Sequence, residues 1–352
     1  MTAPDPMLAS ALLVVLETDQ KSATQEDREI LQLAWDEIRD RLAAGAEVNG
    51  VLTDEYGSTG SLLARAIGWR RYDIAQLLLA HGAAPTDPLT GHTGAHDAAF
   101  GQPEMIRLLM EHGADATCFD RDDLPAALGT DRIPETLLPP DMPDRFFTAQ
   151  RGIRNPQPCD NPFFIEQIKT FRSGYDGAMR TGRGPQNQRS MHPIFSFDRF
   201  GRTVTRLPDG RFVLIAGEHE DSYDSDFCIY NDVCVIGGDG NVDYFLYPVE
   251  DFPPTDFHSA TLLDDHILII GCLGYRTQRQ DGVTPVLRLD LETWRVTPVA
   301  TTGDNPGWIH RHRAELQGGQ IIVSGGCIEP GFRANQDRFA LTLKTMRWHR
   351  IS

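Results

Sequence analysis

The chain has 352 residues, with 33 lysines and arginines against 50 aspartates and glutamates, so its formal net charge at pH 7 is −17. An apolar content of 40% and a charged content of 24% are ordinary for a globular protein and argue against a disordered or membrane-embedded chain. The length predicts two domains, because a single hydrophobic core rarely grows beyond about 250–300 residues.

The charge is unevenly distributed along the chain. Residues 1–150 contain 11 basic and 25 acidic side chains, a net −14, whereas residues 151–352 contain 22 and 25, a net −3. An anionic surface repels phosphate, so we expect no nucleic acid among the partners. The acidic half favours another protein as partner, and a basic one in particular, because opposite charges speed association.

No segment has the pattern of a secretory signal or a membrane span. The most apolar run near the start, residues 7–16, follows no basic region and is shorter than the about 20 apolar residues that cross a bilayer. The six cysteines form no CxxC pair and are interpreted as reduced thiols. We therefore expect a cytoplasmic, bacterial protein that contacts no membrane.

The N-terminal half contains an internal repeat. Residues 72–83 (YDIAQLLLAHGA) align with residues 103–114 (PEMIRLLMEHGA) at an offset of 31 (103 − 72). Apolar residues recur at helical spacing, and each predicted helix ends at His-Gly, where glycine supplies a left-handed C-cap. A helix rich in small residues is predicted before each copy, over residues 62–67 and 95–100, and residues 40–49 are a looser third copy.

The motifs Leu-Leu-Ala-His-Gly-Ala and Leu-Leu-Met-Glu-His-Gly-Ala-Asp resemble those of ankyrin repeats. The Thr-Pro-Leu-His start that is usual in that family is degenerate here, with Thr-Gly-Ser-Leu at 59–62 and Thr-Gly-Ala-His at 93–96. The resemblance implies an α-solenoid over residues 1–130 with an N-terminal helical cap and a surface that recognises proteins. Aromatic and arginine side chains dominate binding hot spots. We expect partner contacts at Tyr56, Trp69, Arg70, Tyr72, His92 and Phe100.

A second repeat occupies the C-terminal half. Residues 211–217, 265–271 and 319–325 each have an apolar strand pattern that ends at glycine, at a spacing of 54 residues (271 − 217 and 325 − 271). His258 and His312 keep the same spacing (312 − 258). Because a residue that recurs in each unit usually serves that unit, these histidines are interpreted as buried and hydrogen-bonded rather than as metal ligands or acid–base groups.

In this repeat, a strand that ends in glycine is followed by a variable loop, a second strand and a turn with tryptophan, as at Trp294 and Trp348. This order of elements resembles the kelch motif. The resemblance implies an all-β, kelch or propeller-like domain over residues 163–352, with about three 54-residue repeats, after a proline-rich linker at 131–162. Propellers usually close with about four to eight blades, so a four-unit ring, an open array of sheets and closure by a second chain all remain open. The predicted fold class is thus α + β multidomain: an N-terminal α-solenoid of ankyrin repeats followed by this all-β domain.

The densest acidic segment is the loop after the first repeated strand, residues 217–226. Its carboxylates include Glu218, Glu220 and Asp221, which are of the type that binds a divalent cation, but their spacing fits no EF-hand loop. We favour a solvated, partner-binding loop, because loops on a rigid scaffold tend to carry function. Trp308 and His310 lie outside the repeat and are also predicted to contact the partner.

No nucleophile elbow, Walker loop or HExxH motif occurs in the sequence. We therefore expect a non-catalytic recognition or scaffold protein that binds another protein, with no catalytic residues, metal or cofactor. One alternative is an immunity or inhibitor protein that neutralises a toxic enzyme by binding it, because an acidic surface captures basic enzymes rapidly. A second alternative is a metal-dependent propeller enzyme.

Overall fold

The computed structural model describes residues 5–18, 22–53, 59–86, 94–120, 122–135, 138, 142–180, 193–219, 227–237 and 241–351. The chain divides into two compact units, Met1–Ala127 and Leu128–Ser352. Within the described ranges, no helix combines the length and the apolar composition needed to cross a bilayer.

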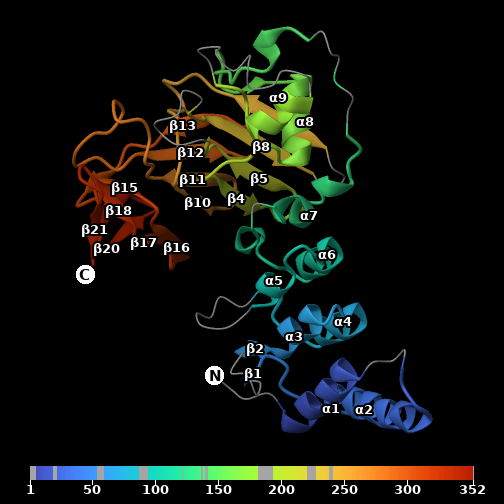
Figure 1. Cartoon of the computed structure of the whole chain (residues 1–352). Helices are drawn as coiled ribbons and strands as arrows, with labels where there is room; N and C mark the ends of the chain where they lie inside the picture. The colour runs from blue at the N-terminus through green and yellow to red at the C-terminus, as the bar shows by residue number, and fades with distance from the viewer. Residues whose placement is uncertain are drawn as a thin grey trace. The chain divides into compact units, whose positions relative to one another are not determined.

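The first unit is built mainly from pairs of helices (Figure 1). Its elements are α1 (Pro6–Glu17), α2 (Gln25–Ala43), β1 (Val51–Thr53), β2 (Thr59–Ser61), α3 (Leu62–Gly68), α4 (Tyr72–Ala80), α5 (Ala95–Ala98), α6 (Pro103–Glu111), the 3-10 helix η1 (Ala116–Cys118) and α7 (Leu124–Leu128), in which the boundary between the units falls. Helix α1 packs on α2, α3 packs on α4 and α5, and α4 contacts α6. Strands β1 and β2 form a two-stranded antiparallel sheet.

The local sequence explains where these helices begin and end. The side chain of Asp5 caps α1 by accepting hydrogen bonds from two backbone N–H groups, and Thr24 and Asp27 form a capping box at the start of α2. Helices α4 and α6 both end at His-Gly, where Gly82 and Gly113 have the same left-handed φ of 89°. The repeated helices predicted from the sequence are present as α3 to α6, although α5 ends at Ala98.

The second unit contains most of the strands and four further helical elements. The helical elements are η2 (Thr130–Arg132), η3 (Asp144–Phe146), α8 (Pro162–Thr170) and α9 (Gly174–Arg180). The strands are β3 (Gln157–Pro158), β4 (Thr203–Arg206), β5 (Phe212–Ile215), β6 (Glu218–His219), β7 (Cys228–Ile229), β8 (Asp232–Ile236), β9 (Val242–Leu246), β10 (Ser259–Leu262), β11 (His266–Ile270), β12 (Val286–Asp290), β13 (Val296–Pro298), β14 (Thr302–Gly303), β15 (Trp308–His310), β16 (Arg313–Gln317), β17 (Gln320–Ser324), β18 (Cys327–Glu329), β19 (Arg333–Ala334), β20 (Arg338–Thr342) and β21 (Arg347–Arg350).

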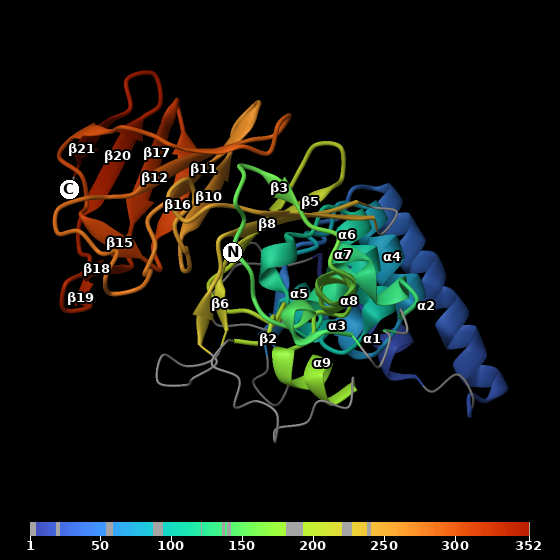
Figure 2. The same ribbon diagram turned by 90° about the horizontal axis from the view of Figure 1, so that it is seen from above.

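Three larger sheets follow one another along the chain, with strand orders β3-β9-β8-β5-β4, β10-β11-β12-β13 and β14-β21-β20-β17-β16. The sheet that contains β11 lies between the other two in both views (Figures 1 and 2), and β10 contacts both β4 and β16. Two small sheets lie beside them: β6-β7 is built from the segment that follows β5, and β15-β18-β19 combines β15, which precedes β16, with the segment that follows β17. Among the strands that the structure describes, β14 pairs with β21 in parallel and the other pairings are antiparallel.

Apolar side chains fill the spaces between neighbouring sheets. Val213, Ile215, Ile267 and Leu289 are wholly buried in a core shared by the first and middle sheets. An equivalent core, which includes Ile321, lies between the middle and last sheets. Burial of one such side chain contributes about 1.5–3 kcal/mol, so the two cores fix the packing of the three sheets.

The 54-residue repeat corresponds to one strand in each sheet, namely β5, β11 and β17. Each is the neighbour of an edge strand, β4, β10 or β16. The repeated histidines are buried and hydrogen-bonded, as the sequence predicts: Nε2 of His258 lies 2.8 Å from the Thr203 hydroxyl, and Nε2 of His312 lies 2.8 Å from the Ser259 hydroxyl. Burial lowers the pKa of His258 to about 3 and that of His312 to about 4, so both side chains are neutral at pH 7.

The predicted fold class is wrong. In the second unit the described strands form separate small sheets and no closed barrel or propeller, and helices α8 and α9 show that the unit is not all-β. In the first unit the described helices do not establish an ankyrin solenoid, since α5 is a single turn and a β-hairpin precedes α3. The repeat supplies three sheets, and the segment before them folds differently, so no fourth sheet closes a ring.

That earlier segment forms an aromatic core. The ring of Phe164 in α8 stacks on Phe195 with centroids 3.9 Å apart, and Phe163 lies 4.6 Å from Phe147. Residues 131–162, which the sequence suggests to be a linker, take part in the second unit: β3 pairs with β9, and Glu135 is ion-paired with arginines that flank or end α9. Large aromatic side chains therefore occupy the space beside β9.

Candidate functional site

Segments that flank the three repeated strands in the chain meet at one pocket in the second unit, with a volume of about 1180 Å³. One wall is the hairpin of β6 and β7, the second is the loop between β11 and β12, and the third is β15 with the turn between β18 and β19. The lining residues are Glu218, Phe227, Ile229, Leu273, Gly274, Tyr275, Arg276, Thr277, Arg279, Gln280, Asp281, Trp308, Arg311, Glu329, Pro330, Gly331 and Phe332. The volume is slightly larger than that of most small-molecule sites, about 300–1,000 Å³.

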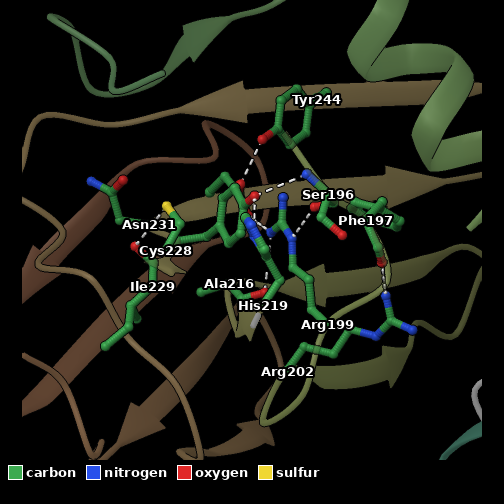
Figure 3. Close-up of polar contacts among 12 residues, drawn as sticks. Ser196, Phe197, Arg199, Arg202, Ala216, His219, Cys228, Ile229, Asn231 and Tyr244 are labelled. Carbon is green, nitrogen blue, oxygen red and sulfur yellow. Dashed lines mark hydrogen bonds and ion pairs between the residues drawn. The ribbon is translucent and has the colours of Figure 1, made fainter. Parts of the chain in front are cut away.

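The first wall is held in place by a buried arginine, Arg199 (Figure 3). Its Nη1 lies 2.7 Å from a carboxylate oxygen of Asp232, and its guanidinium lies 3.3 Å from the centre of the Tyr230 ring. The Tyr230 hydroxyl accepts from the backbone N–H of Ser196 at 2.9 Å and is hydrogen-bonded to Nδ1 of His219 at 2.7 Å, which joins the two sides of the hairpin. Burial disfavours the charge of Arg199, but the adjacent carboxylate outweighs burial and raises the pKa of the guanidinium.

The first wall is also joined directly to the second. The backbone N–H of Ile229 donates to the hydroxyl of Tyr275 at 2.8 Å. The rings of Phe227 and Tyr275 meet edge to face with their centroids 5.7 Å apart. Arg151 donates to the Ile229 carbonyl and, at 2.6 Å, to Oδ1 of Asn231. These contacts fix the aromatic side of the pocket before any ligand binds, which lowers the entropy cost of binding.

A buried tryptophan joins the second wall to the third. Trp308 is 6% exposed, and its indole Nε1 donates to the Leu273 carbonyl at 3.0 Å. Arg279 also holds the loop, because Nε donates to the Leu273 carbonyl and Nη2 to the Gly274 carbonyl, both at 3.1 Å. Nη1 of the same arginine lies 3.3 Å from Glu329. The polar groups of Trp308 and Arg279 are thus used within the protein.

Two other arginines of the pocket, Arg276 and Arg311, differ from Arg279 in that they form no ion pair with a described residue. Within the described part of the chain, no carboxylate lies within ion-pair distance of Arg276 or Arg311. The guanidinium of Arg311 lies 3.4 Å from the centre of the Phe257 ring and 5.5 Å from that of Phe332, and Nη1 donates to Nδ1 of His310 at 3.1 Å. The charge of Arg311 also acts on the buried Asp256 without an ion pair between them, so the N–H groups of both arginines remain available to a ligand.

An acidic pair lies behind the pocket wall. Asp256 is wholly buried, and its Oδ1 accepts from the backbone N–H of Gly274 at 2.6 Å. Its side chain also interacts with that of Glu218, which lines the pocket. Burial raises the pKa of Asp256, while the hydrogen bond from Gly274 opposes the increase. The nearby charges of Arg311 and Arg279 also oppose the increase in the pKa of Asp256.

Two lining residues have an unusual backbone conformation. Arg311 and Phe332 have φ values of 55° and 52°, in the left-handed region that favours glycine. Such a conformation costs about 1–3 kcal/mol for a residue other than glycine and is concentrated at functional sites. Phe332 is also 55% exposed, so neither its burial nor its backbone preference explains its place at the pocket.

The predicted contact residues of the first unit lie at its helix ends. Trp69 and Phe100 are 56% and 61% exposed, at equivalent places of the 31-residue repeat (100 − 69). Tyr72 begins α4 and is 40% exposed, and Arg70 is exposed with φ 56°. Tyr56 and His92 lie outside the described residues. The first unit therefore presents large exposed side chains at two successive helix connections.

Only some of the predicted contact residues of the second unit line the pocket. Glu218 and Trp308 line the pocket. His310 is wholly buried and does not line it, because its strand pairing turns the ring toward Glu329, 3.7 Å away, and burial lowers its pKa to about 4. Glu220 and Asp221 lie outside the described residues.

Several pocket residues were missed by the sequence analysis. They are Tyr275, Arg276, Arg311 and Phe332. The signal that could have found Tyr275, Arg276 and Phe332 is the 54-residue repeat itself, since it places the loops after Gly217, Gly271 and Gly325 at equivalent positions, whereas Arg311 precedes the third repeated strand. Loops at equivalent positions of adjacent sheets lie at the same end of those sheets.

Among the residues that the structure describes, no group of three or more His, Cys, Asp and Glu side chains is arranged to hold a metal ion. No protein-family model matches the chain, and no match to a curated protein was found. The pocket and its chemistry therefore carry the functional argument.

Proposed function

We propose that this is a non-catalytic protein that binds another protein, and that the pocket of the second unit is its binding site. The observation that carries the proposal is the convergence of three separate segments on one pocket lined by Tyr275, Trp308, Phe332 and three arginines. Tryptophan, tyrosine and arginine dominate the hot spots of protein interfaces. A pocket of about 1180 Å³ has room for an extended segment of chain.

The same proposal places the protein in the cytoplasm. All six cysteines are free thiols, including the buried Cys228, Cys234 and Cys272. Free thiols are usual in a reducing compartment, whereas exported proteins tend to pair their cysteines. The net charge of −14 on residues 1–150 favours a partner that carries a basic surface elsewhere. That charge also supports a narrower second candidate, an immunity or inhibitor protein that captures a basic toxic enzyme.

Site-specific photo-crosslinking in cells of the source organism tests the proposal. A photoreactive phenylalanine analogue replaces Phe332 in the pocket or, as the control, Leu316 of β16, which is 49% exposed and does not line the pocket. We expect a discrete crosslinked protein from position 332 and none from position 316. Equal crosslinking at both positions, or none at either, would contradict the pocket as the binding site.

The second candidate function, immunity or inhibition, also predicts what kind of protein the crosslinked partner is. A purified partner that is a basic enzyme, and whose activity falls to background when one equivalent of this protein is added, would support the immunity or inhibitor function. A partner without such an activity would leave recognition as the function and remove the narrower candidate.

A further inference from the structure

We propose that the pocket recognises a carboxylate on the bound segment of the partner, through Arg311 and Arg276. This inference rests on the proposed function and adds the chemistry that the partner must present. Two observations carry it: these two arginines line one pocket, and neither is within ion-pair distance of a carboxylate among the described residues.

Arg311 has the geometry of a preorganised anion-binding group. Phe257 covers one face of the guanidinium at 3.4 Å, Phe332 lies nearby at 5.5 Å, and one Nη donates to His310. A stacked guanidinium loses little further freedom on binding. Its remaining N–H groups lie in the plane of the guanidinium, where a carboxylate accepts two parallel hydrogen bonds. His310 cannot satisfy those remaining donors, because its Nδ1 accepts only one.

Arg276 supplies the second charge at the exposed edge of the pocket. The contrast with Arg279 is informative, because the two arginines lie in the same loop. The guanidinium of Arg279 is occupied by two carbonyls and Glu329, whereas no intramolecular contact occupies that of Arg276 within the described ranges. Arg279 therefore builds the loop, and Arg276 is left to attract and orient the ligand.

The acidic residues of the pocket decide between two kinds of anion. Glu329 lies beside Arg279 and is therefore compensated. Glu218 is adjacent to the buried Asp256, and Asp281 is exposed at the rim. The carboxyl groups that remain, those of Glu218, Asp256 and Asp281, repel a doubly charged phosphate more strongly than a singly charged carboxylate. We therefore assign the carboxylate as the ligand group, with an aromatic or apolar side chain beside it against Trp308 and Phe332.

Selection from a phage-displayed library of random peptides tests this assignment. The immobilised proteins are the full-length wild type, Arg311→Asn, Arg276→Gln and the control Arg313→Asn. Asparagine tolerates the left-handed φ of 55° at position 311, and Arg313 is an exposed arginine two positions away that does not line the pocket. Circular dichroism and the melting temperature of each variant show whether it is folded.

The expected result is enrichment of peptides that contain Asp or Glu next to an aromatic residue on the wild type and on Arg313→Asn. Synthetic copies of these peptides should bind Arg311→Asn and Arg276→Gln about tenfold or more weakly, because a charge-assisted pair is lost. Amidation of the peptide C-terminus separates a terminal carboxylate from a side-chain carboxylate as the recognised group. Replacement of Glu by phosphoserine should not improve binding.

Three outcomes would overturn the inference. These are enrichment of basic or uncharged peptides, equal binding to Arg311→Asn and wild type, and no enrichment on folded wild-type protein. In the first two cases crosslinking from position 332 can still succeed, so the protein-binding function would survive without the carboxylate. The failure of the inference is thus distinguishable from the failure of the proposed function.

Discussion

The guanidinium of Arg199 lies 3.3 Å from the centre of the Tyr230 ring, wholly inside the second unit. Burying an unpaired charge costs several kcal/mol, and here the cost is offset by Asp232 and by the aromatic face. Tyr230 in turn holds the hairpin that forms one wall of the pocket. A charge in the interior thereby fixes the shape of a surface site.

Removal of the partner charge should be costly. Asp232→Asn leaves Arg199 buried without a counterion, so we expect a loss of about 3–5 kcal/mol in the free energy of unfolding, measured by urea denaturation. The matched control is Asp337→Asn, which breaks a half-exposed ion pair with Arg350 at 2.6 Å and should cost about 0–1 kcal/mol. Similar losses of unfolding free energy in the two variants would show that the buried pair of Arg199 and Asp232 does not stabilise this part of the second unit more than an exposed pair does.

The adjacent glycines Gly325 and Gly326 should differ in their tolerance of a side chain. A Cβ at Gly326 would lie 2.4 Å from the carbonyl oxygen of His310 and 2.7 Å from the backbone nitrogen of His312, whereas a Cβ at Gly325 meets nothing within 4 Å. Both residues have positive φ, so Gly325→Ala should cost about 1–2 kcal/mol. We expect Gly326→Ala to cost clearly more, or to prevent folding, and thermal unfolding of the pair gives the comparison. Equal melting temperatures would contradict the close approach.

Much of the local structure could be predicted from the sequence, because it depends on short-range patterns. Helical spacing with His-Gly ends predicts α4 and α6, and apolar runs that end in glycine predict β5, β11 and β17. The fold class could not be predicted in this way. It depends on whether a ring closes, and here the described residues of 142–180 and 193–200 form two α-helices and an aromatic core instead of a further sheet.

The pocket shows the same limit. Glu218 and Trp308 stand out in the sequence as an acidic loop residue and an unrepeated tryptophan, and both line the pocket. Arg311 and Phe332 have no such local signal, because their importance comes from the segments that meet around them. His310 is two residues from Trp308, yet its ring is buried. Local sequence does not reveal which of two neighbouring side chains faces the pocket.

The buried histidines should make the protein sensitive to acid. A folded pKa of about 4 for His312, below the ordinary 6.5, means that the unfolded state binds more protons between these values. The free energy of unfolding should therefore fall as the pH drops from 6.5 toward 4, by on the order of 3 kcal/mol from this residue at pH 4. Urea denaturation at a series of pH values measures the slope.

A variant and a control identify the source of that slope. His312→Gln should be less stable at pH 7, since the neutral imidazole is hydrogen-bonded to Ser259, but its stability should fall less between pH 6.5 and 4. His349→Gln replaces an exposed histidine and should leave the slope unchanged. An unaltered slope in His312→Gln would rule out this histidine as the acid-sensitive group.

Phe332 should show a conflict between stability and binding. Glycine accepts its left-handed φ of 52°, so Phe332→Gly should stabilise the protein by about 0.5 kcal/mol after the entropy cost of glycine is subtracted. The same change removes an aromatic ring from the pocket and should weaken the binding of the crosslinked partner by about 2 kcal/mol. Thermal denaturation and titration calorimetry measure the two effects, and a destabilised variant with unchanged affinity would refute both.

Backbone hydrogen bonds join the three segments that lead into β4, β10 and β16 beside the pocket: the N–H of Phe257 donates to the Gly201 carbonyl at 2.7 Å, and that of Arg311 to the Phe257 carbonyl at 2.8 Å. A change in the length or composition of one loop leaves these links in place. Specificity can therefore change through side chains such as Arg276, which no intramolecular contact occupies within the described ranges, while the contacts that Tyr275 and Trp308 make between the loops are kept.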